Sequence, residues 1–265
     1  MIIDFHTHCF PNYLTRRAVP KLSLDGGNLV PAFDGTAMGL ENAVKSAGAD
    51  RAVVLNIATN PRQQRNVNNF VKMILDRSDI LIPFGSVHPD SEDAIPQLEW
   101  LHAKGVKGIK FHPDFQGFFV DDEKMFPLYE KIAELGMITV FHAGVDISEP
   151  DPVHCTPQRM RKIMPYFGDA PVVAAHMGGF LLWQEVAENL ADTKCYLDTA
   201  LSMGSLPPKW AKDIIKAFGA KRILFGSDMP WSSTRNEISF IKSIGLDAWD
   251  EEMILGRNAE RILGL

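Results

Sequence analysis

Eight short apolar runs, separated by longer amphipathic stretches, restrict the fold of this sequence more than any other feature. The runs cover residues 2–6, 52–57, 80–87, 106–111, 137–141, 171–175, 195–198 and 222–225. Most are almost continuously apolar, as expected for parallel strands that helices cover on their outer side. The segments between them have helical character, at 35–47, 60–77, 90–104, 121–135, 157–166, 180–190, 208–218 and 235–244.

Eight strand–helix units in 265 residues leave two candidate architectures, a closed (β/α)8 barrel and a large open sheet. The count of units and a length close to the roughly 250 residues of a typical barrel favour closure. An open dinucleotide-binding sheet would carry GxGxxG after its first strand, whereas here the first run ends in His6-Thr7-His8. We therefore predict an α/β fold, a single (β/α)8 TIM barrel, with one domain over residues 1–265.

Charge and cysteine content narrow the class of protein. The 27 basic and 33 acidic residues give a formal charge of −6, which argues against a nucleic-acid or polybasic membrane surface. The three scattered cysteines indicate reduced thiols rather than a disulfide framework. The first residues do not resemble a secretion signal, and the uncharged stretch 170–183 is too short for a bilayer. We expect a cytoplasmic protein, with a homodimer as a further hypothesis.

Histidines and one aspartate recur where the apolar runs end. They are His6 and His8 after the first run, then His88, His112, His142 and His176 after the third to sixth, and Asp228 after the eighth. Because parallel strands of a barrel all point the same way, these side chains are expected to meet on one rim. Residues i and i+2 of a strand share a side, so the first two histidines can both face the mouth.

These residue types together predict a metal site. Neutral imidazoles from His6, His8 and His142 with the carboxylate of Asp228 form the ligand mixture of catalytic zinc, with one position open for water. One divalent ion is expected, Zn²⁺ first, with Mn²⁺ or Fe²⁺ as alternatives. A single histidine is more often structural, but several coincidences of residue type and strand end favour the metal.

Several motifs resemble the amidohydrolase superfamily, specifically the amidohydrolase-related branch that also contains non-oxidative decarboxylases. They are IDFHTH at 3–8, GIKFHP at 108–113, FHAG at 141–144, AHMGG at 175–179 and LFGSDMP at 224–230, and LGRNA at 255–259 is similar to the usual final helix. The resemblance implies that His6, His8, His142 and Asp228 hold one metal ion. It also implies that His176 lies beside the attacking water or the substrate.

Two of these residues have candidate catalytic roles. Asp228 can take a proton from the attacking water and return it to the leaving group. His176 can act as an electrostatic stabiliser or proton shuttle, or as a further nitrogen ligand. Lys110 is open to three interpretations: a contact to a substrate carboxylate or oxyanion, a buried salt bridge, or the carboxylated lysine that bridges two metals in other branches.

Further side chains are candidates for substrate binding. His112 either adds a polar contact at the mouth or forms a structural turn, and His88 is similar. Trp231 lines a pocket or packs the last loop. Asp198 either orients a ligand histidine or bonds a neighbouring strand. His102 and His154 receive no role.

The two longest connections, 9–34 and 143–156, follow strand ends and are expected to be structureless lids or substrate-binding segments. Arg16, Arg17 and Lys21 in the first could meet an anionic substrate, although most such charges are only solvated.

The leading functional hypothesis is hydrolysis of a C–N or C–O bond in a small-molecule amide, lactone or ester by metal-activated water. A metal-dependent non-oxidative decarboxylase of a small carboxylic acid is the alternative. A barrel that binds metal or ligand without catalysis is the third hypothesis. Loops set specificity in barrels, so the sequence does not name the substrate.

Overall fold

Eight parallel strands form the centre of the molecule in the computed structural model, which describes residues 1–265. They are β1 (Ile3–Thr7), β2 (Arg51–Leu55), β3 (Leu81–Phe84), β4 (Gly108–Phe111), β5 (Ile138–Phe141), β6 (Val172–Ala174), β7 (Tyr196–Asp198) and β8 (Ile223–Leu224). Each lies on one of the eight apolar runs, so the predicted strands are confirmed. Most are shorter than the runs, because apolar residues next to a strand also pack in the turns that flank it.

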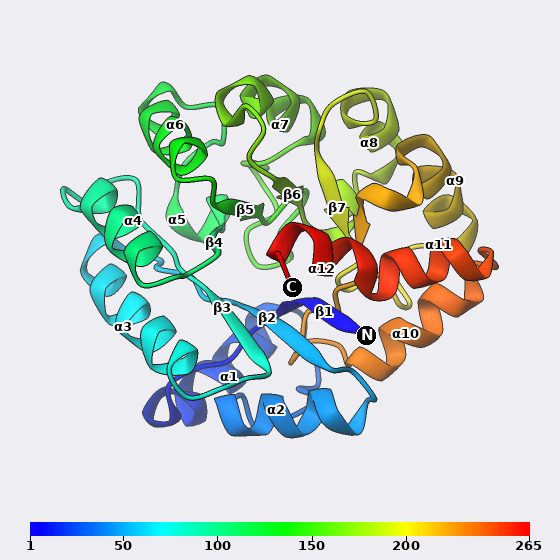
Figure 1. Cartoon of the computed structure of the whole chain (residues 1–265), viewed down its shortest axis with the longest axis horizontal. Coiled ribbons are helices and arrows are strands. Elements are labelled where there is room, and N and C mark those ends of the chain that lie inside the picture. Colours follow the sequence, from blue (N-terminus) through cyan, green and yellow to red (C-terminus); the bar gives the residue numbers. More distant parts are fainter.

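The strands pair in sequence order around a barrel. Continuous ladders join β1-β2-β3 and β4-β5-β6-β7-β8. At the β3–β4 seam, Gly85 N donates to the Gly108 carbonyl at 2.9 Å. At the β8–β1 seam, Phe5 N donates to the Phe225 carbonyl at 2.6 Å, so individual hydrogen bonds bridge both seams. The fold is a TIM barrel, with strands at the centre and a ring of helices outside (Figure 1).

Helices follow the strands around the ring. They are α1 (Asn12–Asp25), α2 (Ala37–Ser46), α3 (Gln64–Leu75), α4 (Ala94–Ala103), α5 (Pro113–Gln116), α6 (Phe126–Glu134), α7 (Pro157–Ile163), α8 (Trp183–Leu190), α9 (Pro208–Phe218), α10 (Thr234–Ser243), α11 (Ala248–Glu252) and α12 (Asn258–Leu263). Each of the eight predicted helical segments overlaps one of these helices. Short 3-10 turns precede α3 and α6 inside the predicted ranges, so these helices begin later than expected.

The prediction that residues 9–34 lack secondary structure was wrong. Helix α1 occupies the middle of this connection and buries only Thr15 and Val19 of its fourteen residues. A helix that buries so little shows no apolar periodicity, and Pro20 inside it further disguises the pattern. In contrast, residues 143–156 contain no helix or strand.

The barrel interior is an apolar layer beneath the strand ends. Its residues come from strands on opposite sides of the ring, namely Ile3, Phe5, Val53, Leu55, Phe84, Ile138, Val140, Val173 and Leu224. Ala259 and Leu263 of α12 join this cluster, so α12 closes the end of the barrel where the strands begin. Both chain termini lie at that end (Figure 1). The opposite end, where the strands finish, is therefore the end with room for a site.

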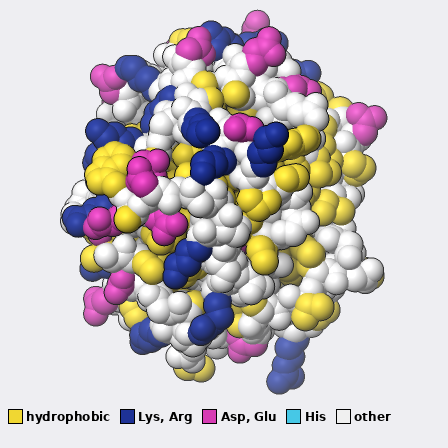
Figure 2. Space-filling model, turned by 90° about the vertical axis from the view of Figure 1, so that its right-hand side faces the viewer, with side chains coloured by type: hydrophobic (Ala, Val, Ile, Leu, Met, Phe, Trp, Pro, Cys, Tyr) yellow, Lys and Arg dark blue, Asp and Glu magenta, His cyan; other side chains and the backbone are white.

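The outer surface carries mixed charge. On the face drawn in Figure 2, basic, acidic and apolar side chains are interspersed, and neither sign of charge dominates. None of the helices has the length and apolar character needed to cross a membrane.

Candidate active site

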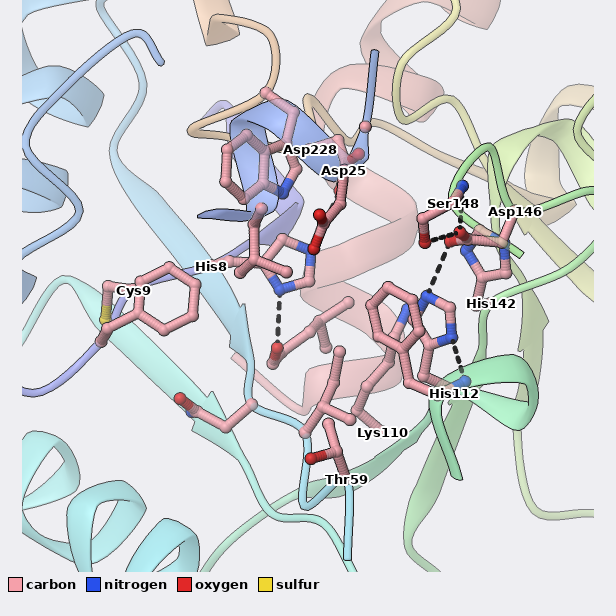
Figure 3. Close-up of a pocket in the computed structure, with 18 of the residues that line it drawn as sticks. His8, Cys9, Asp25, Thr59, Lys110, His112, His142, Asp146, Ser148 and Asp228 are labelled. Atoms are coloured by element: carbon pink, nitrogen blue, oxygen red, sulfur yellow. Dashed lines mark hydrogen bonds and ion pairs between the residues drawn. The ribbon is translucent and has the colours of Figure 1, made fainter. Parts of the chain in front are cut away.

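A cavity of about 500 Å³ opens at the carboxyl ends of the strands. All eight predicted site residues line it: His6, His8, Lys110, His112, His142, His176, Asp228 and Trp231. Figure 3 labels five of them, His8, Lys110, His112, His142 and Asp228. His88, the remaining strand-end histidine, does not line it. Its Nδ1 accepts a hydrogen bond from Asp90 N at 3.2 Å. Of the two interpretations of His88, this contact favours the structural turn over a polar contact at the mouth.

A bulge in β1 directs the first two histidines into the cavity. Asp4 pairs with Ala52 and Thr7 with Val54, so β1 has one more residue than β2 over this stretch. Simple alternation would place His6 opposite Phe5, which belongs to the barrel interior. The extra residue shifts the alternation, so the strand contributes Phe5 to the interior and His6 to the cavity above it.

Gly226, just after β8, makes room for the same histidine. A Cβ at position 226 would lie 2.8 Å from the Cβ of His6, closer than real contacts allow. The glycine therefore permits the close approach of the last strand to the first, and this approach brings Asp228 to the histidine pair.

The two β1 histidines converge on one carboxylate oxygen. Asp228 Oδ1 lies 3.2 Å from His6 Nε2 and 3.0 Å from His8 Nε2. The three ligand atoms lie within 4.8 Å of one another. We call His6, His8 and Asp228 the first group.

Fixed partners set the orientation of both rings. His6 Nδ1 lies 2.8 Å from Asp198 Oδ2, and His8 Nδ1 lies 2.8 Å from the Leu55 carbonyl oxygen. A carbonyl oxygen only accepts, so His8 Nδ1 carries the proton, and the carboxylate favours the same tautomer in His6. Neutral rings then turn the lone pairs of both Nε2 atoms toward Asp228. The two lone pairs and the carboxylate oxygen repel one another at these distances. A proton or a metal ion between them would remove this repulsion.

Asp198 makes contacts of both predicted kinds, one with the ring of His6, a predicted metal ligand, and one with the backbone of His176 just after the neighbouring strand β6. The prediction left these alternatives open because sequence cannot show which side chain the end of β7 faces. Its other oxygen accepts from the backbone N of His176 at 2.9 Å and of Ala200 at 3.1 Å. One carboxylate thus fixes the His6 ring and the turn that carries His176.

A second group of possible ligands lies on the opposite wall. His112 Nε2 lies 3.4 Å and His142 Nε2 lies 3.9 Å from Asp146 Oδ2, and the two rings stack with centroids 4.1 Å apart. We call His112, His142 and Asp146 the second group. The structure thus places His142 nearest to these two residues, whereas His6, His8 and Asp228 meet one another directly.

His176 lies between the two groups and determines the state of His142. Its Nδ1 donates to the Ala200 carbonyl at 3.1 Å, so the neutral ring has a bare Nε2. His142 Nδ1, 3.1 Å from this atom, must then be the donor. His142 Nε2 is consequently bare as well, and it is buried without a hydrogen-bond partner. An unpartnered buried nitrogen with a free lone pair is a feature that a metal ion or a ligand would satisfy.

The two residues that are predicted to be catalytic are among six non-glycine residues with a positive φ. His176 has φ +56° and Asp228 has φ +69°, in the left-handed region that side chains other than glycine rarely adopt. Such conformations cost roughly 1–3 kcal/mol and persist where the surrounding structure enforces them. The strain is consistent with a site whose geometry is held for function.

Lys110 is buried with no carboxylate partner. The residue is 1% exposed, and its Nζ donates only to His6 Nε2, at 3.5 Å. No aspartate or glutamate oxygen lies within 4.0 Å of it, so the salt-bridge interpretation is wrong. Burial lowers the pKa of Lys110 to about 8, although Asp198 and Asp228 are near enough to oppose this shift.

Burial and mutual proximity keep the histidines neutral. Burial is the main cause that lowers the pKa of His6 and His142 well below the usual value, and the nearby positive charges add to it. Burial also lowers the pKa of His176. Burial alone would raise the pKa of Asp146, but hydrogen bonds from His112 and Ser148 lower it to about 2. Neutral imidazoles beside ionised carboxylates are the protonation states that metal binding requires.

The basic residues of the first long connection do not reach the cavity. Arg16 and Arg17 do not line it, and Lys21 pairs with Asp25 on the same helix. Helix α1 instead places Tyr13, Leu14 and Leu22 against the cavity. This connection therefore contributes mainly apolar contacts to the cavity.

Sequence reasoning missed several polar residues around the site. Asp146 follows the fifth strand by five residues in an irregular segment, where no periodicity marks it. Asp114 is buried and accepts from His154 Nδ1 at 2.9 Å, which gives His154 a structural contact that was not predicted. Asn56, at the end of β2, lines the cavity and has an unpartnered amide nitrogen. An acid or amide just after a strand was the only available signal for these residues.

Three solved structures are similar to this fold over nearly the whole chain. An uncharacterised TIM-barrel protein from Bordetella bronchiseptica has a TM-score of 0.81 at 21% identity, covering 99% of this chain and 98% of its own. 5-Carboxyvanillate decarboxylase from Sphingomonas paucimobilis has a TM-score of 0.75 at 16% identity, covering 100% of this chain and 99% of its own. A dihydroxybenzoic acid decarboxylase from a Polaromonas species, with bound manganese and the inhibitor 2-nitroresorcinol, has a TM-score of 0.73 at 15% identity, covering 100% of this chain and 97% of its own.

A family model connects the sequence to a function class. The model described as amidohydrolase matches residues 3–265, and no curated protein sequence matches the chain. The protein belongs to this amidohydrolase family, as the motifs predicted. It is an enzyme of the amidohydrolase-like kind, so the hypothesis of a barrel without catalysis is not retained.

Proposed function

We propose that the cavity binds one divalent metal ion through His6, His8, His142 and Asp228 and hydrolyses a C–N or C–O bond of a small-molecule amide, lactone or ester. The convergence of two imidazole Nε2 atoms on Asp228 Oδ1 carries the proposal. The unpartnered Nε2 of His142 supports its place as the fourth ligand. Three nitrogens and one oxygen suit Zn²⁺ best, and Mn²⁺ or Fe²⁺ are alternatives.

A bound divalent ion would polarise a substrate carbonyl and lower the pKa of a water molecule, so that hydroxide is available to attack this carbonyl near neutral pH. Asp228 would accept the proton of the attacking water and deliver it to the departing nitrogen or oxygen. His176 Nε2, which lies between the two groups and carries a lone pair, would take up and relay a proton, and the protonated ring would then stabilise the charge that develops on the substrate oxygen. Lys110, His112 and Trp231 would contact the rest of the substrate.

Decarboxylation is the second candidate function. Two similar folds belong to decarboxylases, and one of these structures contains manganese. Lys110 is the specific observation that favours it, since a buried ammonium without an acid partner suits a carboxylic acid substrate. The C–C bond to the carboxylate would break, its electron pair would stay on the substrate carbon, and Asp228 or His176 would supply a proton to that carbon.

One experiment separates the two reactions. Protein loaded with zinc, manganese or iron is assayed against panels of amides, lactones, esters and aromatic carboxylates in water that is labelled at its oxygen atom. Hydrolysis is expected to place the label in the product acid. Release of carbon dioxide without label in the organic product would instead establish decarboxylation. A protein that binds no stoichiometric metal would contradict the proposed site itself.

A further inference from the structure

We propose that the substrate carries a carboxylate, bound by Lys110 beside the reacting centre, on a largely apolar body. This inference deepens the proposed function and rests on it for the location of the reacting centre. The evidence comes from three features of the cavity: its one lysine, the partners of its carboxylates, and the apolar residues that line its walls.

Lys110 is the only lysine or arginine that lines the cavity. Its Nζ is held 3.5 Å from His6 Nε2, which is also a predicted metal-ligating atom. A buried ammonium is usually paired with an acid, because isolated charge is costly to remove from water. The carboxylate of Asp198 contacts His6, and Asp228 Oδ1 faces His6 and His8, so neither acid pairs with Lys110. The unmet charge of Lys110 therefore calls for an anion from the ligand.

Asn56 is a second donor in the cavity. Its side-chain nitrogen is buried and makes no hydrogen bond, and the residue lines the same cavity from the end of β2. Lys110 lies at the end of β4, so the two donors come from strands on the same side of the barrel. Two donors in one cavity, an amide without an acceptor and an ammonium without an acid partner, favour a ligand with several acceptor atoms, as a carboxylate has.

The number of donors distinguishes a carboxylate from a phosphate. No arginine lines the cavity, and one lysine with one amide is a small donor set for a dianion that proteins usually hold with arginine forks or helix N-termini. A carboxylate has one charge and two acceptor oxygens, which matches what this wall offers.

The rest of the lining selects an apolar body. Sixteen of the 32 lining residues are hydrophobic, among them Phe10, Leu14, Phe70, Phe115 and Trp231. The other acids of the lining are already engaged, Asp25 with Lys21 and Asp146 with His112. A cavity of about 500 Å³ can enclose a small aromatic or branched aliphatic acid.

The test compares 2-naphthoate with 2-naphthamide, which has nearly the same shape without the charge. Kd is measured by titration calorimetry on metal-loaded and chelator-treated protein. We expect the wild type to prefer the carboxylate by about tenfold or more in both states, because a charge-assisted hydrogen bond is worth roughly 1.5–3 kcal/mol. Lys110→Met should remove this preference and leave the metal content unchanged.

The matched control is Lys107→Met, the same substitution at an exposed lysine just before β4, which should keep the preference. Thermal unfolding of both variants verifies that they are folded. Equal affinity of the wild type for the two probes, or no binding of 2-naphthoate, would overturn the inference. Tight binding of 2-naphthyl phosphate in its place would overturn the choice of carboxylate.

A loss of metal in Lys110→Met, together with an added CO₂ in the intact mass of the wild type, would also overturn it and assign Lys110 to a bridge between two metals. A different result would contradict the proposed function. Absence of bound metal contradicts it, whereas the preference for carboxylate in chelator-treated protein would still stand.

Discussion

The two groups of histidines and carboxylates on opposite walls of the cavity have the same composition but different support. In the first group, His6 lies on β1 and His8 directly follows this strand, and their outer nitrogens lie 2.8 Å from Asp198 Oδ2 and the Leu55 carbonyl oxygen. In the second group, His112 precedes the one-turn helix α5, and Asp146 lies in an irregular segment. His112 Nδ1 accepts a hydrogen bond from Phe115 N at 3.4 Å.

This difference teaches that composition alone does not make a metal site. In the first group the outer partners turn both lone pairs inward toward a shared oxygen. In the second group the neutral His112 ring, with Nδ1 as an acceptor, turns an N–H toward Asp146, which satisfies the carboxylate without a metal. We therefore expect the first group to control metal binding and catalysis, and Asp146 to position His112.

The largest effect is expected for Asp228→Asn. Removal of the shared carboxylate takes away both a ligand and the base, so the variant should lose bound metal, and kcat/KM should fall by about 10³-fold or more. Elemental analysis and steady-state kinetics on the substrate found by the screen measure both quantities. Full metal content in this variant would mean that the first group does not hold the ion, and the contrast between the two groups would fail.

His176→Asn should separate turnover from metal binding. The amide can still donate to the Ala200 carbonyl, but it cannot relay a proton, so kcat should fall by about 10²-fold or more while most of the metal remains. The same metal analysis provides the control. A stoichiometric loss of metal would show that His176 is itself a ligand.

Asp198→Asn should weaken metal binding without abolishing it. Loss of the carboxylate behind a ligand histidine typically costs about 10–100-fold in metal affinity. Competition with a chromogenic chelator measures the metal Kd. Asp114→Asn is the matched control, since its buried carboxylate contacts His154 and lies behind the second group. Equal losses in the two variants would mean that both groups bind metal.

Asp146→Asn should have the smallest effect. We expect unchanged metal content, a change of less than about tenfold in kcat/KM, and the same rise in Tm on metal addition as the wild type. Metal at about 1,000 times its Kd stabilises the folded state by about 4 kcal/mol, which Asp228→Asn should lose. The rise in Tm on metal addition is measured by thermal unfolding of Asp146→Asn and Asp228→Asn. Loss of the rise in Asp146→Asn would give the second group a metal of its own.

The sequence by itself determined the eight strand–helix units, the rim of histidines and the family. Parallel strands bury both faces, so their apolar runs stand out, and strand ends share one rim whatever their separation in sequence. Helix α1 escaped prediction because it buries two residues and therefore leaves no periodic pattern.

Only the tertiary structure decided which histidines act together. The bulge between Asp4 and Thr7 and the close approach of Gly226 to His6 bring the first group together, and both are local backbone events that alternation cannot predict. The contacts of Asp198 and Ala200 with the rings fix the tautomers. Such contacts join residues more than 20 positions apart, so they exist only once the barrel has formed.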